Sequence, residues 1–307
     1  MQSFRLQVGN NVVVTGAHSI PAGGSIQPTS AALPLIVGLH GGGYDHRYFD
    51  ALPGYSAKDL SVALGVPFVS IDRPSYGGTT SVLPIPANSD FTEESAKVLN
   101  QSILPGIWNS FGLANRCSCM IILAHSFGVM PAIATAALHA GHVNPGYPLG
   151  GLILSGMGNT VRRNDARHGF EPVDDPHIKM SHELKDTVMF KPGTCSPAML
   201  QETIRLDSPM PLAEVAEFAE TWMPHWKEKY ASRVQVPVFY MLVEDDPFFF
   251  VDDSELRHCV TAFVNSPRAE GSLMLDAPHC VELSHWSSGW YARCFGFALE
   301  CAASFMC

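Results

Sequence analysis

Residues 119–128 read Cys-Met-Ile-Ile-Leu-Ala-His-Ser-Phe-Gly, and this stretch decides the fold. Its first five residues form an apolar run that predicts a buried strand, and residues 129–138, Val-Met-Pro-Ala-Ile-Ala-Thr-Ala-Ala-Leu, predict a helix. Between them Ser126 has a small residue two positions to each side, which a sharp turn requires because strand and helix pass very close there. The pattern predicts a serine hydroxyl exposed at the end of a sheet, with the backbone N–H of Phe127 beside it.

Two more apolar runs end in polar or glycine-containing loops. Residues 35–43 read Leu-Ile-Val-Gly-Leu-His-Gly-Gly-Gly, a predicted strand that runs into a glycine-rich turn. Because glycine has no Cβ, such a turn lets backbone N–H groups approach a substrate oxygen closely. Residues 66–80 read Val-Pro-Phe-Val-Ser-Ile-Asp-Arg-Pro-Ser-Tyr-Gly-Gly-Thr-Thr, another strand and loop. Strands and helices alternate from residue 35 to 155, which predicts a parallel sheet with helices on both faces.

The C-terminal part adds an acidic loop and a histidine-bearing loop, each after an apolar run. Residues 237–243 predict a strand that ends in Glu244-Asp245-Asp246-Pro247, and residues 272–276 predict a short strand that leads to Pro278-His279. At the N-terminus, residues 3–18 alternate around Gly9-Asn10-Asn11, which is typical of an antiparallel hairpin. The chemistry-bearing residues therefore follow one another in the order serine, acid, histidine.

This order and these motifs resemble the α/β-hydrolase fold, whose catalytic triad occurs in the same chain order. The resemblance extends over nearly the whole chain and implies an α/β architecture, a mostly parallel central sheet flanked by helices. The alternation stops between residues 157 and 232, a charged, proline-broken segment that resembles the cap many α/β-hydrolases carry. We therefore expect residues 1–156 and 233–307 to form the core and residues 157–232 a helical cap. Helices are predicted over residues 92–111, 127–140, 181–189 and 211–230.

The resemblance also implies catalytic roles for three side chains. Ser126 is the expected nucleophile and His279 the base that activates it, since an unassisted hydroxyl is a weak nucleophile. Asp246 is the expected acid, which would hold the imidazole in the right tautomer and stabilise the imidazolium.

Other residues compete for two of these roles. Asp245 and, to a lesser degree, Glu244 are rivals of Asp246, and His285 is a rival of His279. His125 lies on the turn itself and is expected to point away from the serine. The chain departs from the family pattern by replacing a glycine at three positions, Ala124, Val243 and Pro278.

The resemblance implies an oxyanion hole built from backbone N–H groups. Phe127 would supply one donor, and Gly42 and Gly43 one or two more. His40 precedes these glycines and is expected to be a structural histidine that hydrogen-bonds the loop. Residues 72–78, Asp-Arg-Pro-Ser-Tyr-Gly-Gly, resemble the Asp-x-Pro-Gly-x-Gly loop of the family, from which Ser75 departs, and we expect a structural role for them.

Composition narrows the class of partner. The 307 residues are 46% hydrophobic and 16% charged, with a net charge of −10, which argues against nucleic acid and anionic membrane surfaces as partners. We see neither a secretory signal nor an apolar run as long as a membrane span, so a cytoplasmic protein with its eight cysteines reduced is expected. The histidines, including His168, His177 and His182 in the cap, match no zinc spacing. We expect neither a metal nor a cofactor.

A triad with an oxyanion hole implies acyl transfer through an acyl-enzyme. The cap is rich in Met and Trp, which favours an apolar, adaptable pocket, although such residues can also pack the cap or form a dimer interface. The oligomeric state stays open. The expected substrate-binding residues are Tyr44, Trp222, Trp226 and Phe248.

The chain is also similar to trans-acting thioesterases of fungal polyketide synthesis, on its overall texture and on residues 278–283, Pro-His-Cys-Val-Glu-Leu. This likeness implies an acyl chain delivered by an acyl carrier protein and released as a lactone or an acid. A cap that excludes water would favour lactone formation. The open alternatives are a general carboxylesterase, a carbon–carbon bond hydrolase and a catalytically silent binding protein.

Overall fold

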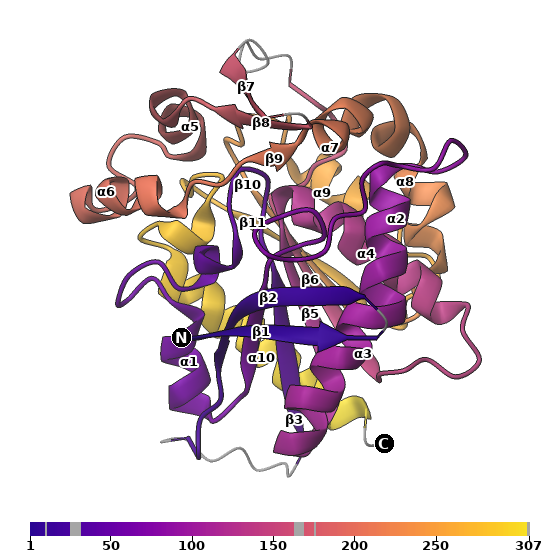
Figure 1. Ribbon diagram of the computed structural model, residues 1–307. Coiled ribbons are helices and arrows are strands. Elements are labelled where there is room, and N and C mark those ends of the chain that lie inside the picture. The colour runs from indigo at the N-terminus through magenta and orange to yellow at the C-terminus, as the bar shows by residue number, and fades with distance from the viewer. Residues whose placement is uncertain (10, 25–31, 163–168, 175, 306–307) are drawn as a thin grey trace.

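The structure is a computed structural model that describes residues 1–9, 11–24, 32–162, 169–174 and 176–305. Its central sheet has eight strands in the order β1-β2-β4-β3-β5-β6-β10-β11, with helices on both faces (Figure 1). Strands β1, β2 and β4 pair antiparallel, and the pairs from β4 to β11 are parallel, as predicted. The strands are β1 (Gln2–Val8), β2 (Val12–Ser19), β3 (Leu33–Leu39), β4 (Phe68–Ile71), β5 (Cys117–His125), β6 (Leu149–Ser155), β10 (Val238–Val243) and β11 (Ala269–Met274).

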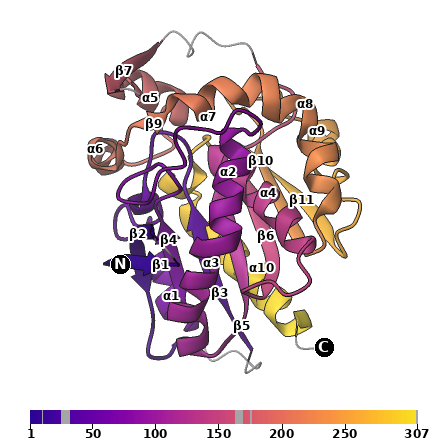
Figure 2. The ribbon, with the colours of Figure 1, turned by 45° about the vertical axis from the view of Figure 1, so that its right-hand side comes forward.

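Two hydrophobic clusters cover the two faces of this sheet. Along β3, Leu35 and Val37 enter one cluster and Ile36 the other, because successive side chains of a strand point to opposite faces. Helices α2 (Phe91–Val98), α3 (Leu104–Ile107), α4 (Val129–Ala140) and α9 (Asp253–Val260) contribute to the first cluster. Helices α1 (Ala57–Leu64) and α10 (Ser287–Phe305) contribute to the second (Figure 2). The inner strands β3, β4, β5, β6 and β10 are buried on both sides, which explains their nearly continuous apolar sequences.

The helical regions predicted from residues 92 and 211 onward contain π-helical turns. Two of these turns end just before a proline, and a third, Trp108–Gly112, has no proline after it. In the region predicted over 92–111, Leu99–Ile103 is a π-turn that ends two residues before Pro105. In the region predicted over 211–230, Phe218–Trp222 is a π-turn that ends two residues before Pro224. A proline cannot donate the usual backbone hydrogen bond and clashes with the preceding turn, so the helix widens there.

The segment 157–232, called the insertion below, lies between β6 and β10 and gathers at one end of the molecule in both views (Figures 1 and 2). Besides helices it contains a three-stranded sheet in the order β7-β8-β9, which the sequence did not predict. These strands are short and partly exposed, so they leave no apolar alternation in the sequence. The elements are β7 (Phe170–Asp174), β8 (His177–Met180), α5 (His182–Met189), α6 (Pro197–Leu206), β9 (Met210–Pro211), α7 (Leu212–Glu217) and α8 (Met223–Lys229).

The N-terminal hairpin of β1 and β2 is present as predicted, although Asn10 of its turn lies outside the described residues. The seven described cysteines are free thiols, six of them buried. Within the described ranges, no helix has both the length and the hydropathy that a bilayer crossing requires.

Candidate active site

Ser126 lies at the point where β5 turns into helix. Its backbone is left-handed, with φ at +51°, a conformation that a non-glycine residue adopts only under local strain. A 3-10 turn over Ser126–Gly128 then leads directly into α4. The turn needs glycine at 128, because a Cβ there would lie 2.5 Å from the carbonyl oxygen of Leu39. This sharp turn places the serine at the end of a buried strand, where it is half-buried and not fully exposed.

His279 joins the serine to a buried carboxylate. Its Nε2 lies 3.1 Å from Ser126 Oγ, and its Nδ1 lies 2.7 Å from Asp246 Oδ2. Because an ionised carboxylate can only accept, Nδ1 carries the proton and Nε2 is left free to accept the serine proton. Asp246 Oδ1 accepts from the backbone N–H of Phe248 at 2.8 Å, and the Phe248 ring stands edge-on to the imidazole. Both the carboxylate and the imidazole are shielded from water.

The rival residues lie elsewhere. Asp245 is exposed and pairs with Lys191 at 2.8 Å, and this hydrogen bond lowers the pKa of its carboxyl group. His285 approaches Tyr55 Oη at 3.4 Å through Nδ1. His125 points away from the serine to Ser155 Oγ at 3.0 Å, and burial keeps its pKa well below the usual value. Of the acids and histidines weighed in the sequence, the structure brings Asp246 and His279 to Ser126.

The glycine-rich turn after β3 faces the serine from the other side. Gly42 lines the same cavity as Ser126 and Phe127. The backbone N–H groups of Gly42 and Gly43 donate to no acceptor among the described residues, so they are available to a bound oxygen. The N–H of Phe127 opens a helical turn and therefore has no partner within that turn. These three are the groups that the sequence predicts for an oxyanion hole.

His40 holds the base of this turn. Its Nδ1 donates to the carbonyl oxygen of Gly41 at 2.8 Å, and its Nε2 accepts from the backbone N–H of Arg73 at 3.2 Å. Burial, aided by the charge of Arg73, lowers the pKa of His40 to about 3, so the ring is neutral at physiological pH. The neutral ring therefore links the glycine-rich turn to Arg73 by hydrogen bonds, which agrees with the structural role expected for it.

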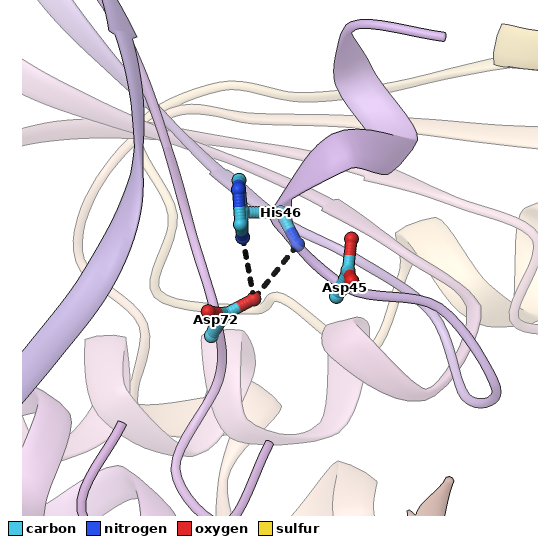
Figure 3. A group of neighbouring side chains, drawn as sticks. All are labelled: Asp45, His46 and Asp72. Carbon is cyan, nitrogen blue, oxygen red and sulfur yellow. Dashed lines mark hydrogen bonds and ion pairs between the residues drawn. The ribbon is translucent and has the colours of Figure 1, made fainter. Parts of the chain in front are cut away.

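Asp45, His46 and Asp72 form a second group beside the turn (Figure 3). Their potential ligand atoms lie within 4.8 Å of one another, the one such group of at least three found among the described residues. Asp72 Oδ1 accepts from both the backbone N–H of His46, at 3.0 Å, and its Nδ1, at 2.8 Å, while Asp45 binds Arg47. Asp72 also accepts from the hydroxyl of Thr15. These bonds tie the loop after β3 to the loop after β4. Of the histidines in the insertion, His177 pairs with Asp174 and His182 with Asp186, and His168 lies outside the described residues.

A cavity of about 590 Å³ opens above Ser126, within the range of small-molecule sites. Its walls are mostly apolar and come from the turns of the core and from the insertion. Arg162 and Glu220 are the charged residues among those that line it, and Arg162 Nε donates to the carbonyl oxygen of Phe249 at 2.8 Å. Four methionines give the walls an adaptable apolar surface, Met157, Met180, Met189 and Met210.

Three residues expected in the pocket lie outside its lining, whereas Phe248 does line it. Trp222 and Trp226 stack on one another, 6.1 Å between ring centroids, inside the core cluster that contains α4. Tyr44 is buried in the opposite cluster, where its hydroxyl lies 3.5 Å from Cys280 Sγ. The aromatic content of the segment indicated burial correctly, but it could not distinguish packing from ligand contact.

Two buried charged contacts between the insertion and the core were missed. Lys185 of α5 reaches Gly43, and Glu214 of α7 binds Arg73. Lysine and glutamate on amphipathic helices ordinarily face water, so nothing in the local sequence distinguishes these two from exposed neighbours.

Comparison with known proteins agrees with this geometry. The model of the alpha/beta hydrolase family matches residues 36–289, which is most of the chain. The protein therefore belongs to the alpha/beta hydrolase family and is an α/β-hydrolase enzyme. No curated protein sequence gave a match.

Solved structures share the fold at low sequence identity. Proline iminopeptidase from Mycobacterium smegmatis is 19% identical with a TM-score of 0.56, and the match covers 99% of each chain. A lipase-esterase related protein from Clostridium acetobutylicum is 11% identical with a TM-score of 0.59, covering 93% of this chain and 99% of that one. An esterase from M. tuberculosis is 14% identical with a TM-score of 0.53, covering 96% and 91%. These likenesses establish the fold.

Proposed function

We propose that the protein is a serine hydrolase that transfers the acyl group of an apolar ester or thioester through an acyl-enzyme on Ser126. The observation that carries this proposal is His279, whose two ring nitrogens lie within hydrogen-bond distance of Ser126 Oγ and Asp246 Oδ2 at the floor of an apolar cavity. His279 takes the serine proton as Oγ attacks the carbonyl carbon, and later gives it to the leaving group. Water then attacks the acyl-enzyme, with His279 again as base.

The negative charge that develops on the carbonyl oxygen needs donors in a dry site. In this proposal the backbone N–H groups of Phe127, Gly42 and Gly43 supply them. The proposed role of residues 157–232 is that of a cap, since 15 of the 20 residues that line the cavity belong to the insertion and would shield the acyl group from water. Phe248 would contact the acyl group from the side of the acid, because its ring lines the cavity beside His279.

A series of p-nitrophenyl esters of increasing chain length tests this proposal. We expect a burst of p-nitrophenol equal to the enzyme concentration, and a mass increase of one acyl group that maps to Ser126. The Ser126→Ala variant should give neither. Turnover that persists in Ser126→Ala and leaves no acyl group on the protein would mean that water attacks the ester directly, and would overturn the acyl-enzyme. The absence of both turnover and adduct with every ester would leave a binding protein as the better account.

A narrower candidate is the release of a polyketide-type chain as a lactone, from a thioester that an acyl carrier protein delivers. The apolar, methionine-rich lining of the cavity favours it, because a site poor in water lets an internal hydroxyl compete for the acyl-enzyme. Thioesters of N-acetylcysteamine, with and without a terminal hydroxyl, separate the two outcomes by their products. A lactone from the hydroxylated chain would support cyclisation, and free acid alone would support simple hydrolysis.

A further inference from the structure

One lysine of the insertion reaches the glycine-rich turn from inside the protein. Lys185 belongs to α5, and its side chain is only 1% exposed. Its Nζ donates to the carbonyl oxygen of Gly43 at 2.5 Å and to Asp207 Oδ1 at 2.6 Å, and it lies 3.8 Å above the ring centre of Tyr44. The three N–H bonds of an ammonium group are thus matched by two oxygens and one aromatic face. Such a complete set of partners is what a buried lysine requires.

The Gly43 carbonyl oxygen accepts hydrogen bonds from two donors of the insertion. The backbone N–H of Ser208 donates to the same oxygen at 3.1 Å, so both of its lone pairs are bound by residues outside the core. Gly43 itself is left-handed, with φ at +72°, a conformation that glycine can adopt but that its sequence does not impose. The contacts from the insertion therefore select the conformation of the loop whose N–H groups face the cavity.

The other end of the loop is tied to the insertion as well. His40 accepts from the backbone N–H of Arg73, and the Arg73 guanidinium forms a buried bidentate pair with Glu214 of α7. Tyr76 donates its hydroxyl to the same carboxylate, and its ring meets the His40 ring edge-on at 4.8 Å. Two ion pairs thus flank the glycine turn, the buried Arg73–Glu214 pair and the partly buried Lys185–Asp207 pair, and each has at least one member in the insertion.

We propose that Lys185 is a positioning residue for the oxyanion hole, so that the hole is complete only while the insertion is seated on the core. The inference rests on the proposed acyl transfer and adds a coupling between the insertion and the reacting centre. Lys185 touches neither the serine nor the cavity. It acts through the Gly43 carbonyl, which fixes where the N–H groups of Gly42 and Gly43 point. Loss of its charge-assisted bond would let the loop rotate these donors away from the oxyanion.

The direct test measures how strongly the site stabilises an oxyanion. An alkyl trifluoromethyl ketone, labelled with 13C at its carbonyl, forms a hemiketal with a serine hydroxyl, and its 13C shift reports the pKa of the adduct oxygen. In Lys185→Met we expect that pKa to rise by about one unit or more, kcat for the best ester to fall about 10- to 100-fold, and KM to change less than about threefold. A lysine that only stabilised the fold would lower the melting temperature without moving the oxyanion pKa.

Lys191→Met is the matched control, because Lys191 lies in the same insertion but forms an exposed pair with Asp245. It should leave both the oxyanion pKa and kcat unchanged. If Lys185→Met does not fold, Asp207→Asn replaces it, since this change removes the carboxylate that keeps the buried ammonium charged. A smaller rise in the oxyanion pKa and a fall in kcat of about threefold are then expected.

The outcomes separate the two proposals. If the ketone forms no adduct on Ser126 in the wild type, the acyl-transfer proposal fails and the role of Lys185 falls with it. If the wild type forms the adduct and the folded Lys185 or Asp207 variant gives the same oxyanion pKa, only the positioning role is overturned. A raised pKa in the Lys191 variant as well would also overturn it, since the effect would then not depend on the Gly43 contact.

Discussion

The core and the insertion contribute to the site in different ways. The core brings Ser126, His279 and Asp246 to the ends of β5, β11 and β10, where parallel strands meet at one edge of the sheet. The insertion brings walls for the cavity and two buried charges, Lys185 and Glu214, that hold the turns around it. Groups placed by strand ends are fixed by local sequence, whereas groups placed by tertiary ion pairs depend on partners far away in the chain. Substitutions in the two regions test this difference.

Substitutions of the core residues should have the largest effect. Ser126→Ala and His279→Ala should each lower kcat for the best ester about 10⁴-fold or more, because either change removes the paired nucleophile and base. The double variant should be hardly worse than either single one, since the two groups act as a unit. Steady-state kinetics with unfolding curves as a check on folding provide the measurement. Purely additive losses would show that the two side chains work independently.

The acid offers an internal control within two adjacent residues. Asp246→Asn should lower kcat about 10³- to 10⁴-fold, because an amide no longer fixes the imidazole tautomer. Asp245→Asn removes only an exposed pair with Lys191 and should change kcat less than about twofold. Equal losses in the two variants would mean that the roles of these aspartates are assigned wrongly.

In the insertion, the largest effect should be on stability. Glu214→Gln leaves the buried guanidinium of Arg73 without a countercharge, so the free energy of unfolding should fall by about 3–5 kcal/mol in urea titrations. Arg73→Met combined with Glu214→Met should recover much of this loss, since neither buried charge then remains. A single variant as stable as the wild type would contradict the idea that this pair secures the insertion.

The walls of the cavity should govern chain-length preference. Val215 lines the cavity from α7, and Val215→Trp should reduce the ratio of kcat/KM for long esters to that for short esters about tenfold. Leu200→Trp is the matched control on α6, where the side chain is 41% exposed and lies outside the lining. A substrate profile that shifts equally in both variants would place the acyl chain elsewhere.

The smallest effect concerns pH. Burial alone would lower the pKa of His46, but the hydrogen bond and the charge of Asp72 outweigh it and raise that pKa above the usual value. The stabilisation is therefore fully present below about pH 6.5 and is lost as the pH rises through the raised pKa. His46→Gln should lower the free energy of unfolding by about 0.5 kcal/mol more at pH 6 than at pH 9, since solvent screens part of the partly exposed ring. A larger loss of unfolding free energy at pH 9 than at pH 6 would contradict the proposed stabilisation of protonated His46 by Asp72.

The sequence was informative where periodicity and local motifs determine structure. Buried strands were recognised from continuous apolar runs, and the turn at Ser126 from the small residues around it. The family resemblance indicated Asp246 with Asp245 and Glu244 as rivals, and the structure shows Asp246 beside His279. The small sheet β7-β8-β9 escaped prediction because its strands are too short and too exposed to show a pattern.

Prediction from sequence was weakest for residues whose position depends on tertiary packing. Trp222, Trp226 and Tyr44 were expected against the ligand, but the structure uses them as core residues. A helical lysine is ordinarily exposed, but the structure buries Lys185. Its ammonium group binds Asp207 and the carbonyl of Gly43, neither of which is adjacent to it in sequence. Contacts of this kind are visible only once the chain is folded.

The measurement that tests the central claim most directly is the reaction of the purified protein with a fluorophosphonate probe, followed by peptide mass spectrometry. The account predicts one adduct, on Ser126, that is absent in Ser126→Ala and forms far more slowly in His279→Ala. Asp245→Asn should label at the wild-type rate. Absence of labelling in the folded wild type, while a small ester still binds in the cavity, would contradict the acyl-enzyme and leave the triad geometry without a catalytic function.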